Sequence, residues 1–182
     1  MTDITATSLS QLGPRICILG PSNSGKSTLA AAIGRSRDLP PVHLDQLYHQ
    51  PGTDWQPRPR AEFVALHDQA IQGERWVMDG NYTQCLPQRL ARATGFILLD
   101  ASTPLSLWRY VRRCWFETDR KGALEGAKDS IKWSMLRYIA VVTPANRRRY
   151  DALFGEVALP KVRLATPPAL AHFYRKEGLR SR

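Results

Sequence analysis

Short apolar runs alternate along the chain with longer amphipathic stretches. Five of the runs have the length of β-strands: RICIL (15–19), VHLD (42–45), WVMD (76–79), GFILLD (95–100) and KVRLA (161–165). Their apolar residues follow one another instead of alternating with polar ones, which is typical of strands buried on both faces of a parallel sheet. Strands that alternate with helices predict an α/β fold with a five-stranded parallel sheet flanked by helices.

Prolines and glycines mark the segments between these runs. Pro104 and Pro167 each follow a threonine, which predicts two helices with proline in the first turn. The Pro- and Gly-rich stretch 49–60 predicts a loop, and a helix is expected near residues 61–72. Segment 117–130 is charged and has no clear core face, so we expect it to be a mobile flap.

The length of the chain, 182 residues, fits a single domain with one core. We expect one P-loop kinase-like unit over residues 1–182, with a flexible leader over 1–14 and a small helical lid with its following helices near 117–150. The cysteines share no close spacing, so neither a disulfide framework nor a zinc site is indicated. They are Cys17, Cys85 and Cys114.

The N-terminal segment lacks the charged and apolar regions of a secretory signal, and no apolar run is long enough to cross a bilayer. We therefore expect a cytoplasmic protein that does not contact membranes. The formal net charge is +10, which indicates a polyanionic partner. Nucleic acid, an anionic surface and phosphorylated small molecules all fit this charge.

A glycine-rich segment, ILGPSNSGKST (18–28), follows the first predicted strand and opens a predicted helix. It contains G-x-x-x-x-G-K-[ST], the P-loop or Walker A pattern, in which backbone N–H groups and a helix N-terminus bind phosphates. Lys26 would reach the β- and γ-phosphates of ATP, and the Ser27 hydroxyl would be a ligand of Mg²⁺. The predicted nucleotide-binding residues of this segment are Gly20, Ser22, Asn23, Ser24, Gly25, Lys26, Ser27 and Thr28.

Three later stretches carry a family resemblance: LDQLYHQPGTDW (44–55), WVMDGNY (76–82) and LLDASTPLSLWRYVRR (98–113). In this order after the P-loop, they resemble the adenylate-kinase-like proteins labelled DNA topology modulation proteins. The resemblance runs from about Ile16 to about Tyr174. It implies a branch of the nucleoside and nucleotide kinases with a five-stranded parallel sheet.

Two aspartates are candidates for the metal site. The resemblance implies that Asp79, at the end of WVMD, holds Mg²⁺ through water, although a strand-end aspartate can also cap the next helix. Asp100, at the end of GFILLD, is the rival. Both would lie at the carboxyl ends of strands, where open α/β sheets bind ligands, and the resemblance favours Asp79.

The acceptor is expected near the second predicted strand. Asp45 follows VHL, where related small-molecule kinases place an acidic residue against the acceptor. A carboxylate there could accept or orient the proton of an attacking hydroxyl, and a helix cap or turn residue is the alternative. Nearby aromatic side chains could stack on a ring-bearing acceptor or pack within their own domain. They are Tyr48, His49 and Trp55.

The helix after Asp100 carries two arginines, Arg109 and Arg113, on one flank. The resemblance implies that Arg109 stacks on the adenine and that Arg113 contacts phosphate, and a planar charged guanidinium suits both tasks. A solvated basic face is the alternative. The apolar face of this helix is expected to contain Leu105, Trp108, Val111 and Trp115.

The resemblance also gives roles to Arg89, as an arginine for the acceptor phosphate, and to Thr166, in the segment that reads the adenine. The chain departs from adenylate kinases at residues 79–82, because DGNY stands where they have D-G-F-P-R. The missing arginine weakens the case for a nucleoside monophosphate acceptor. The run NRRRY (146–150) could supply closing arginines, a nucleic-acid patch or a solvated helix face.

These features predict an Mg²⁺- and ATP-dependent phosphotransferase, a kinase that acts on a small molecule such as a nucleoside or nucleotide. The alternative is an ATP-binding regulator or ATPase that contacts DNA or RNA through its basic surface. We find no recognised nucleic-acid module in the sequence, which favours the enzyme.

Overall fold

The computed structural model describes residues 7–53, 55–116 and 143–180. Its sheet has five strands, and each neighbouring pair is parallel in the order β2-β3-β1-β4-β5. The predicted α/β fold with a five-stranded parallel sheet is therefore confirmed. The strands are β1 (Arg15–Leu19), β2 (Pro41–His43), β3 (Trp76–Asp79), β4 (Gly95–Leu99) and β5 (Lys161–Leu164).

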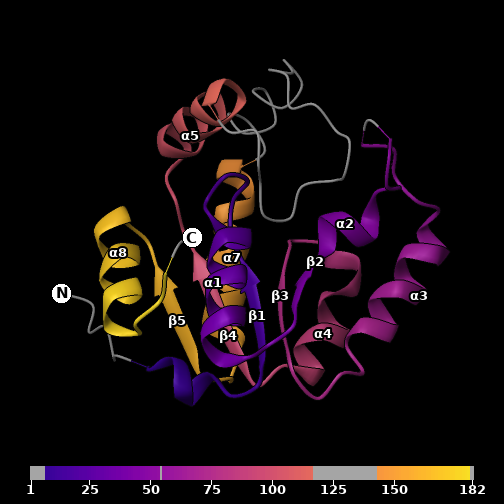
Figure 1. The fold of residues 1–182 in the computed structure, drawn as a ribbon, viewed down its shortest axis with the longest axis horizontal. Coiled ribbons are helices and arrows are strands. Elements are labelled where there is room, and N and C mark those ends of the chain that lie inside the picture. The colour runs from indigo at the N-terminus through magenta and orange to yellow at the C-terminus, as the bar shows by residue number, and fades with distance from the viewer. Residues whose placement is uncertain (1–6, 54, 117–142, 181–182) are drawn as a thin grey trace.

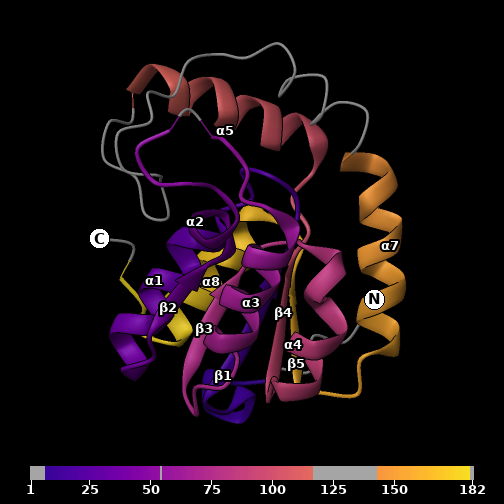
Figure 2. The same cartoon turned by 90° about the vertical axis from the view of Figure 1, so that its right-hand side faces the viewer.

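Helices cover both faces of the sheet. The described helices are η1 (Leu9–Leu12), α1 (Lys26–Arg37), α2 (Leu44–Tyr48), α3 (Arg60–Ala70), η2 (Thr83–Cys85), α4 (Leu86–Arg92), α5 (Thr103–Phe116), α7 (Thr143–Glu156) and α8 (Pro167–Lys176). Figure 2 shows α1 and α8 on one side of the sheet and α4 and α7 on the other, with α5 across the end of the molecule above β4. None of the described helices is long and apolar enough to cross a membrane.

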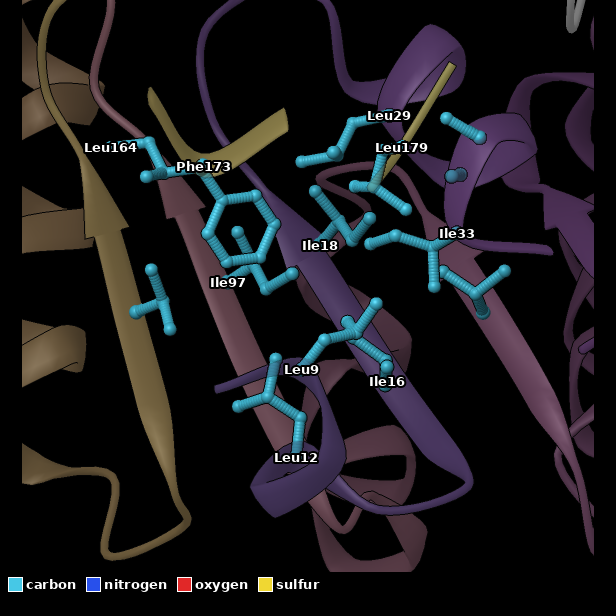
Figure 3. Close-up of a cluster of buried hydrophobic side chains, with 14 of the residues drawn as sticks. Leu9, Leu12, Ile16, Ile18, Leu29, Ile33, Ile97, Leu164, Phe173 and Leu179 are labelled. Atoms are coloured by element: carbon cyan, nitrogen blue, oxygen red, sulfur yellow. The ribbon is translucent and has the colours of Figure 1, made fainter. Parts of the chain in front are cut away.

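Two hydrophobic clusters hold these layers together. The first joins β1, β4 and β5 to α1 and α8 through residues such as Ile16, Ile97 and Phe173 (Figure 3). The second packs α4 and α7 against the other face of β1 and β4, with Leu86 and Tyr150 among its buried members. Because both faces of the central strands are covered, β1, β3 and β4 are apolar or buried along nearly their whole length.

The edge strands differ from the prediction that every strand is buried on both faces. Pro41 in β2 is exposed, and β5 alternates, with Val162 and Leu164 buried and Arg163 exposed. An edge strand has one sheet neighbour only, so part of its surface meets solvent. The second strand also ends two residues earlier than expected, at His43, which places Asp45 in the first turn of α2.

The flexible leader predicted over residues 1–14 is wrong for residues 9–12. These residues form η1, and the side chains of Leu9 and Leu12 are buried in the first cluster (Figure 3). Their burial removes apolar surface from water, so it fixes this segment against the sheet. The predicted flap over 117–130 lies outside the described residues, whereas α7 (Thr143–Glu156) begins within the range 117–150 assigned to the lid and its following helices and ends beyond it.

The predicted helix starts are confirmed. Helix α5 begins at Thr103, next to Pro104, and α8 begins at Pro167. Thr166 is the N-cap of α8, and its Oγ1 accepts a hydrogen bond of 3.2 Å from the backbone N–H of Ala169. Helix α3 spans Arg60–Ala70, close to the expected 61–72.

Candidate functional site

The glycine-rich segment forms the connection between β1 and α1, as the sequence predicts (Figure 1). Gly20 has φ 151°, and a Cβ there would lie 2.2 Å from the carbonyl oxygen of Leu99 in β4. Gly25 has φ 98° and is the N-cap of α1. The backbone at each of these two positions is therefore suited to glycine, and together they turn the chain sharply from strand to helix.

The N-terminus of α1 meets the conditions for a phosphate site. Its N-cap has no side-chain hydrogen bond and its first turn holds no acidic residue, so positive partial charge remains there. The Lys26 ammonium lies over the same loop, with Nζ 2.9 Å from the Gly20 oxygen and 2.7 Å from the Pro21 oxygen. A concave loop with a cation and a helix N-terminus can bind a phosphorylated ligand.

Ser27 and Asp79 come together although they are 52 residues apart in sequence. The Ser27 hydroxyl donates a hydrogen bond of 2.8 Å to Oδ2 of Asp79. Asp79 is the last residue of β3, and its side chain is only 5% exposed. Mg²⁺ prefers oxygen ligands, such as hydroxyl and carboxylate oxygens. This pair therefore fits a magnesium ion beside the phosphate loop.

Sequence reasoning missed two residues that hold this loop and its carboxylate. Nδ1 of His43, at the end of β2, lies 2.5 Å from Oδ1 of Asp79. Asn81 binds the backbone of Gly20 twice, because its Oδ1 accepts from the Gly20 N–H at 3.2 Å and its Nδ2 donates to the Gly20 oxygen at 2.7 Å. Asn81 follows β3, so these two bonds fix the start of the P-loop against the neighbouring strand end.

Asp100, the rival metal candidate, has a different environment. Its Oδ1 accepts a hydrogen bond of 2.6 Å from Nε of Arg147, and its Oδ2 accepts one of 2.5 Å from Nη2 of Arg163. Arg163 also pairs with Asp151. Both carboxylate oxygens are thus occupied by guanidinium groups, and Asp100 joins β4, β5 and α7. Arg147, from the NRRRY run, contributes to this ion-pair network.

Replacing Asp100 with asparagine is expected to reduce the free energy of unfolding by about 1–3 kcal/mol at neutral pH. Burial opposes the charge on Asp100, but the bonds from Arg147 and Arg163 outweigh it and lower the pKa of this carboxyl. A lowered pKa stabilises the fold above the unfolded value, and this stabilisation is lost as pH falls through the folded value. Denaturant unfolding of the wild type and of Asp100→Asn should show that the difference in their free energies of unfolding shrinks below about pH 4. An unchanged difference down to pH 2 would contradict this account.

Asp45 lies beside a cluster of aromatic side chains and is bonded to one of them. Tyr82, which follows Asn81, donates a hydrogen bond of 2.7 Å from its hydroxyl to Oδ1 of Asp45. The Tyr82 ring lies 4.7 Å from that of Tyr48 and 5.0 Å from that of Phe63, measured between centroids. His49 and Trp55 contact each other with their centroids 5.1 Å apart. The aromatic residues predicted near the acceptor thus pack against their own domain.

Arg89 lies on α4, and its side chain is fully buried. All three guanidinium nitrogens lack a hydrogen-bond partner among the residues that the structure describes. Burial lowers the pKa of His67, and the Arg89 charge lowers it further. Burial raises the pKa of Cys85, and the Arg89 charge opposes this rise, so the guanidinium lies near α3 and η2. A buried unpaired guanidinium is costly, which indicates that an anion or water completes this environment.

Arg109 contacts the P-loop, with its Nη1 donating a hydrogen bond of 2.8 Å to the Ser24 oxygen. It lines a pocket with Thr166, from the start of α8, and the pocket is mostly apolar. Burial lowers the pKa of the Arg109 guanidinium, and nearby Arg112 lowers it further. The remaining lining residues are Ser24, Leu99, Ala101, Leu105, Leu164, Ala165, Pro167 and Leu170.

Among the side chains of α5 that the structure describes, the predicted apolar face is wrong at Trp108, and the side chain of Trp115 lies outside them. Trp108 is 58% exposed, with the Arg112 guanidinium 5.5 Å from its ring centroid, whereas Ser106 and Tyr110 are the buried residues of the described part. Because Ser106 and Tyr110 are four apart, the buried side is rotated from the expected one. Arg113 is on α5, but its side chain lies outside the described residues.

The parallel sheet, the P-loop after β1 and the carboxylate at the end of β3 define the fold of P-loop kinases. A scan against protein-family models finds no match for this chain, and a search of curated proteins finds no relative. Solved structures do match. A gluconokinase from Sinorhizobium meliloti 1021 has a TM-score of 0.54 at 19% identity, covering 92% of this chain and 95% of that one.

A shikimate kinase from Aquifex aeolicus vf5 has a TM-score of 0.50 at 20% identity. The match covers 90% of this chain and 96% of the kinase. At these identities the likeness concerns the fold. The chain therefore has the P-loop kinase fold over nearly its whole length.

Proposed function

We propose that the protein is an ATP- and Mg²⁺-dependent kinase that transfers the γ-phosphoryl group to a small molecule. The observation that carries this proposal is the convergence of Lys26, Ser27 and Asp79 at one phosphate loop. The small-molecule kinase names of the two structural neighbours agree with it. Within this proposal the chain belongs to the adenylate-kinase-like branch that its sequence resembles.

The nucleotide would lie with its phosphates on the loop N–H groups and its base toward the pocket between Arg109 and Thr166. Lys26 would exchange its bonds with the Gly20 and Pro21 oxygens for bonds to the β- and γ-phosphates. Ser27 and Asp79 would hold Mg²⁺, which when bound neutralises charge on the β- and γ-phosphate oxygens. We assign Arg113 to the transferring phosphoryl group from its position on α5, one turn beyond Arg109.

On the acceptor side, Asp45 would orient or deprotonate the attacking hydroxyl. Its carboxylate is held by Tyr82, whose hydroxyl occupies one oxygen and leaves the other for a substrate. Arg89 would pair with an anionic group of the acceptor, a carboxylate or phosphate, because a guanidinium buried without a partner is stabilised by such a charge.

The test is ADP release measured with ATP and Mg²⁺ across candidate acceptors. The panel comprises nucleosides, nucleotides, neutral sugars, DNA and RNA, with gluconate and shikimate as hydroxy acids. We expect one anionic small molecule to raise ADP release above the hydrolysis of ATP alone and to appear phosphorylated in the product. Stimulation by nucleic acid only, with no phosphorylated small molecule, would replace the kinase with the alternative, a regulator that binds DNA or RNA.

Arg89→Met is expected to raise the KM for that acceptor by about 10- to 100-fold, the value of a charge-assisted hydrogen bond. The affinity for ATP should stay near that of the wild type, and the melting temperature should stay equal or rise because a buried charge is removed. Arg92→Met is the matched control on the same helix, since Arg92 bonds to the carbonyl oxygens of Ile71 and Gln72. An unchanged acceptor KM with a raised melting temperature would leave Arg89 without a role in binding.

A further inference from the structure

His43 lies beside Asp79 because of the register of the sheet. Strands β2 and β3 are parallel neighbours, and their last pair joins His43 to Asp79. Nδ1 of His43 and Oδ1 of Asp79 are 2.5 Å apart, and the two side chains are 11% and 5% exposed. Since an ionised carboxylate can only accept, the imidazole donates from Nδ1.

The two oxygens of Asp79 have different partners. Oδ1 accepts from His43, and Oδ2 accepts from the hydroxyl of Ser27. If Ser27 turns its oxygen toward a metal ion, its hydrogen bond to Asp79 is lost. The bond from His43 does not involve the phosphate loop, so it can hold the carboxylate in both states.

We propose that His43 is a positioning residue that fixes the Asp79 carboxylate and thereby sets the affinity of the nucleotide site for Mg²⁺. This inference rests on the proposed function, because it takes Ser27 and Asp79 as the metal-binding pair. Hydrogen-bond partners outside the ligand shell orient metal ligands, and their loss costs about 10- to 100-fold in metal affinity. His43 reaches Asp79 from β2, and its Nδ1 bonds to the carboxylate and not to the phosphate loop.

Three substitutions separate hydrogen bonding from packing. In His43→Asn the amide nitrogen is as many bonds from the backbone as Nδ1, so it can donate to Asp79. In His43→Gln the amide nitrogen instead corresponds to Nε2, and His43→Ala has no donor. The measurement is ADP binding by titration calorimetry, without metal and over a series of Mg²⁺ concentrations, with thermal unfolding as a check on folding.

We expect His43→Ala and His43→Gln to raise the Mg²⁺ concentration for half-maximal enhancement of ADP binding by about 10- to 100-fold. Their affinity for ADP without metal should match that of the wild type, and His43→Asn should restore most of the Mg²⁺ effect. Equal losses with and without Mg²⁺ in all three variants would overturn the proposal, since they would reflect damage to the end of β2.

The same titrations distinguish this inference from the proposed function. Wild-type Mg²⁺ dependence in all three variants would overturn the role of His43 alone. A wild-type protein whose ADP affinity ignores Mg²⁺ would overturn the metal site and this inference together. A shift in the Mg²⁺ requirement, found in a protein that phosphorylates no acceptor, would support His43 and contradict the kinase.

Discussion

Replacing Lys26 with alanine is expected to lower kcat/KM for ATP by about 10³-fold or more. The ammonium group lies over the phosphate loop, 2.9 and 2.7 Å from the Gly20 and Pro21 oxygens. In the proposed function it neutralises charge on the transferring phosphate. The fold should survive, because alanine is a good helix former at the first position of α1. ADP release and ATP binding by calorimetry measure the loss, and thermal unfolding checks the fold.

Lys176→Ala is the control for this variant. Lys176 lies near the end of α8, where it pairs with Glu177, so its loss should leave ATP turnover and binding near the wild-type values. If Lys26→Ala binds and hydrolyses ATP like the control, the P-loop does not bind phosphates in this protein. The proposed function would then lose its main support.

The features that the sequence predicted well are local. The P-loop has a fixed spacing within eight residues, and strands β1 and β3 match the expected runs, Arg15–Leu19 and Trp76–Asp79, at both ends. Central strands are apolar on both faces, so their limits are visible in the pattern. The strand β2 was less well predicted, because an edge strand needs fewer apolar residues and gives a weaker signal.

The contacts that organise the site are long-range, and no local pattern predicts them. His43 meets Asp79 only because β2 is next to β3, and Asn81 meets Gly20 only because β3 is next to β1. A parallel sheet can be ordered in several ways from the same runs, so sequence gives the polar residues at strand ends without their pairing. The available signal was that polar side chains cluster after β2 and β3.

The choice of metal ligand between Asp79 and Asp100 also depends on long-range contacts. Both follow apolar runs, so the local pattern does not separate them, and only the family resemblance favoured Asp79. Both are also buried in the structure. The structure distinguishes them by their partners, which are a hydroxyl and an imidazole for Asp79 and two guanidinium groups for Asp100. Arg147 reaches Asp100 from 47 residues away in sequence, a contact that depends on how α7 packs.

Asp79→Asn is therefore expected to lower kcat by about 10²–10³-fold at a fixed low Mg²⁺ concentration. Asparagine keeps the size of the side chain but removes the charge that attracts the ion, so higher Mg²⁺ should recover part of the activity. The affinity for ATP without metal should stay near that of the wild type, because the carboxylate faces Ser27 and His43 and the phosphates are assigned to the loop.

Asp100→Asn is the matched comparison, since it removes the same charge directly after β4, which is separated from β3 by β1 in the sheet. Its expected loss is in the free energy of unfolding, with the Mg²⁺ requirement unchanged at a temperature where the protein stays folded. Activity of both variants over a Mg²⁺ series, beside their denaturant unfolding curves, decides the assignment. If Asp100→Asn raises the Mg²⁺ requirement and Asp79→Asn does not, the metal lies at the end of β4 and the assignment to Asp79 is wrong.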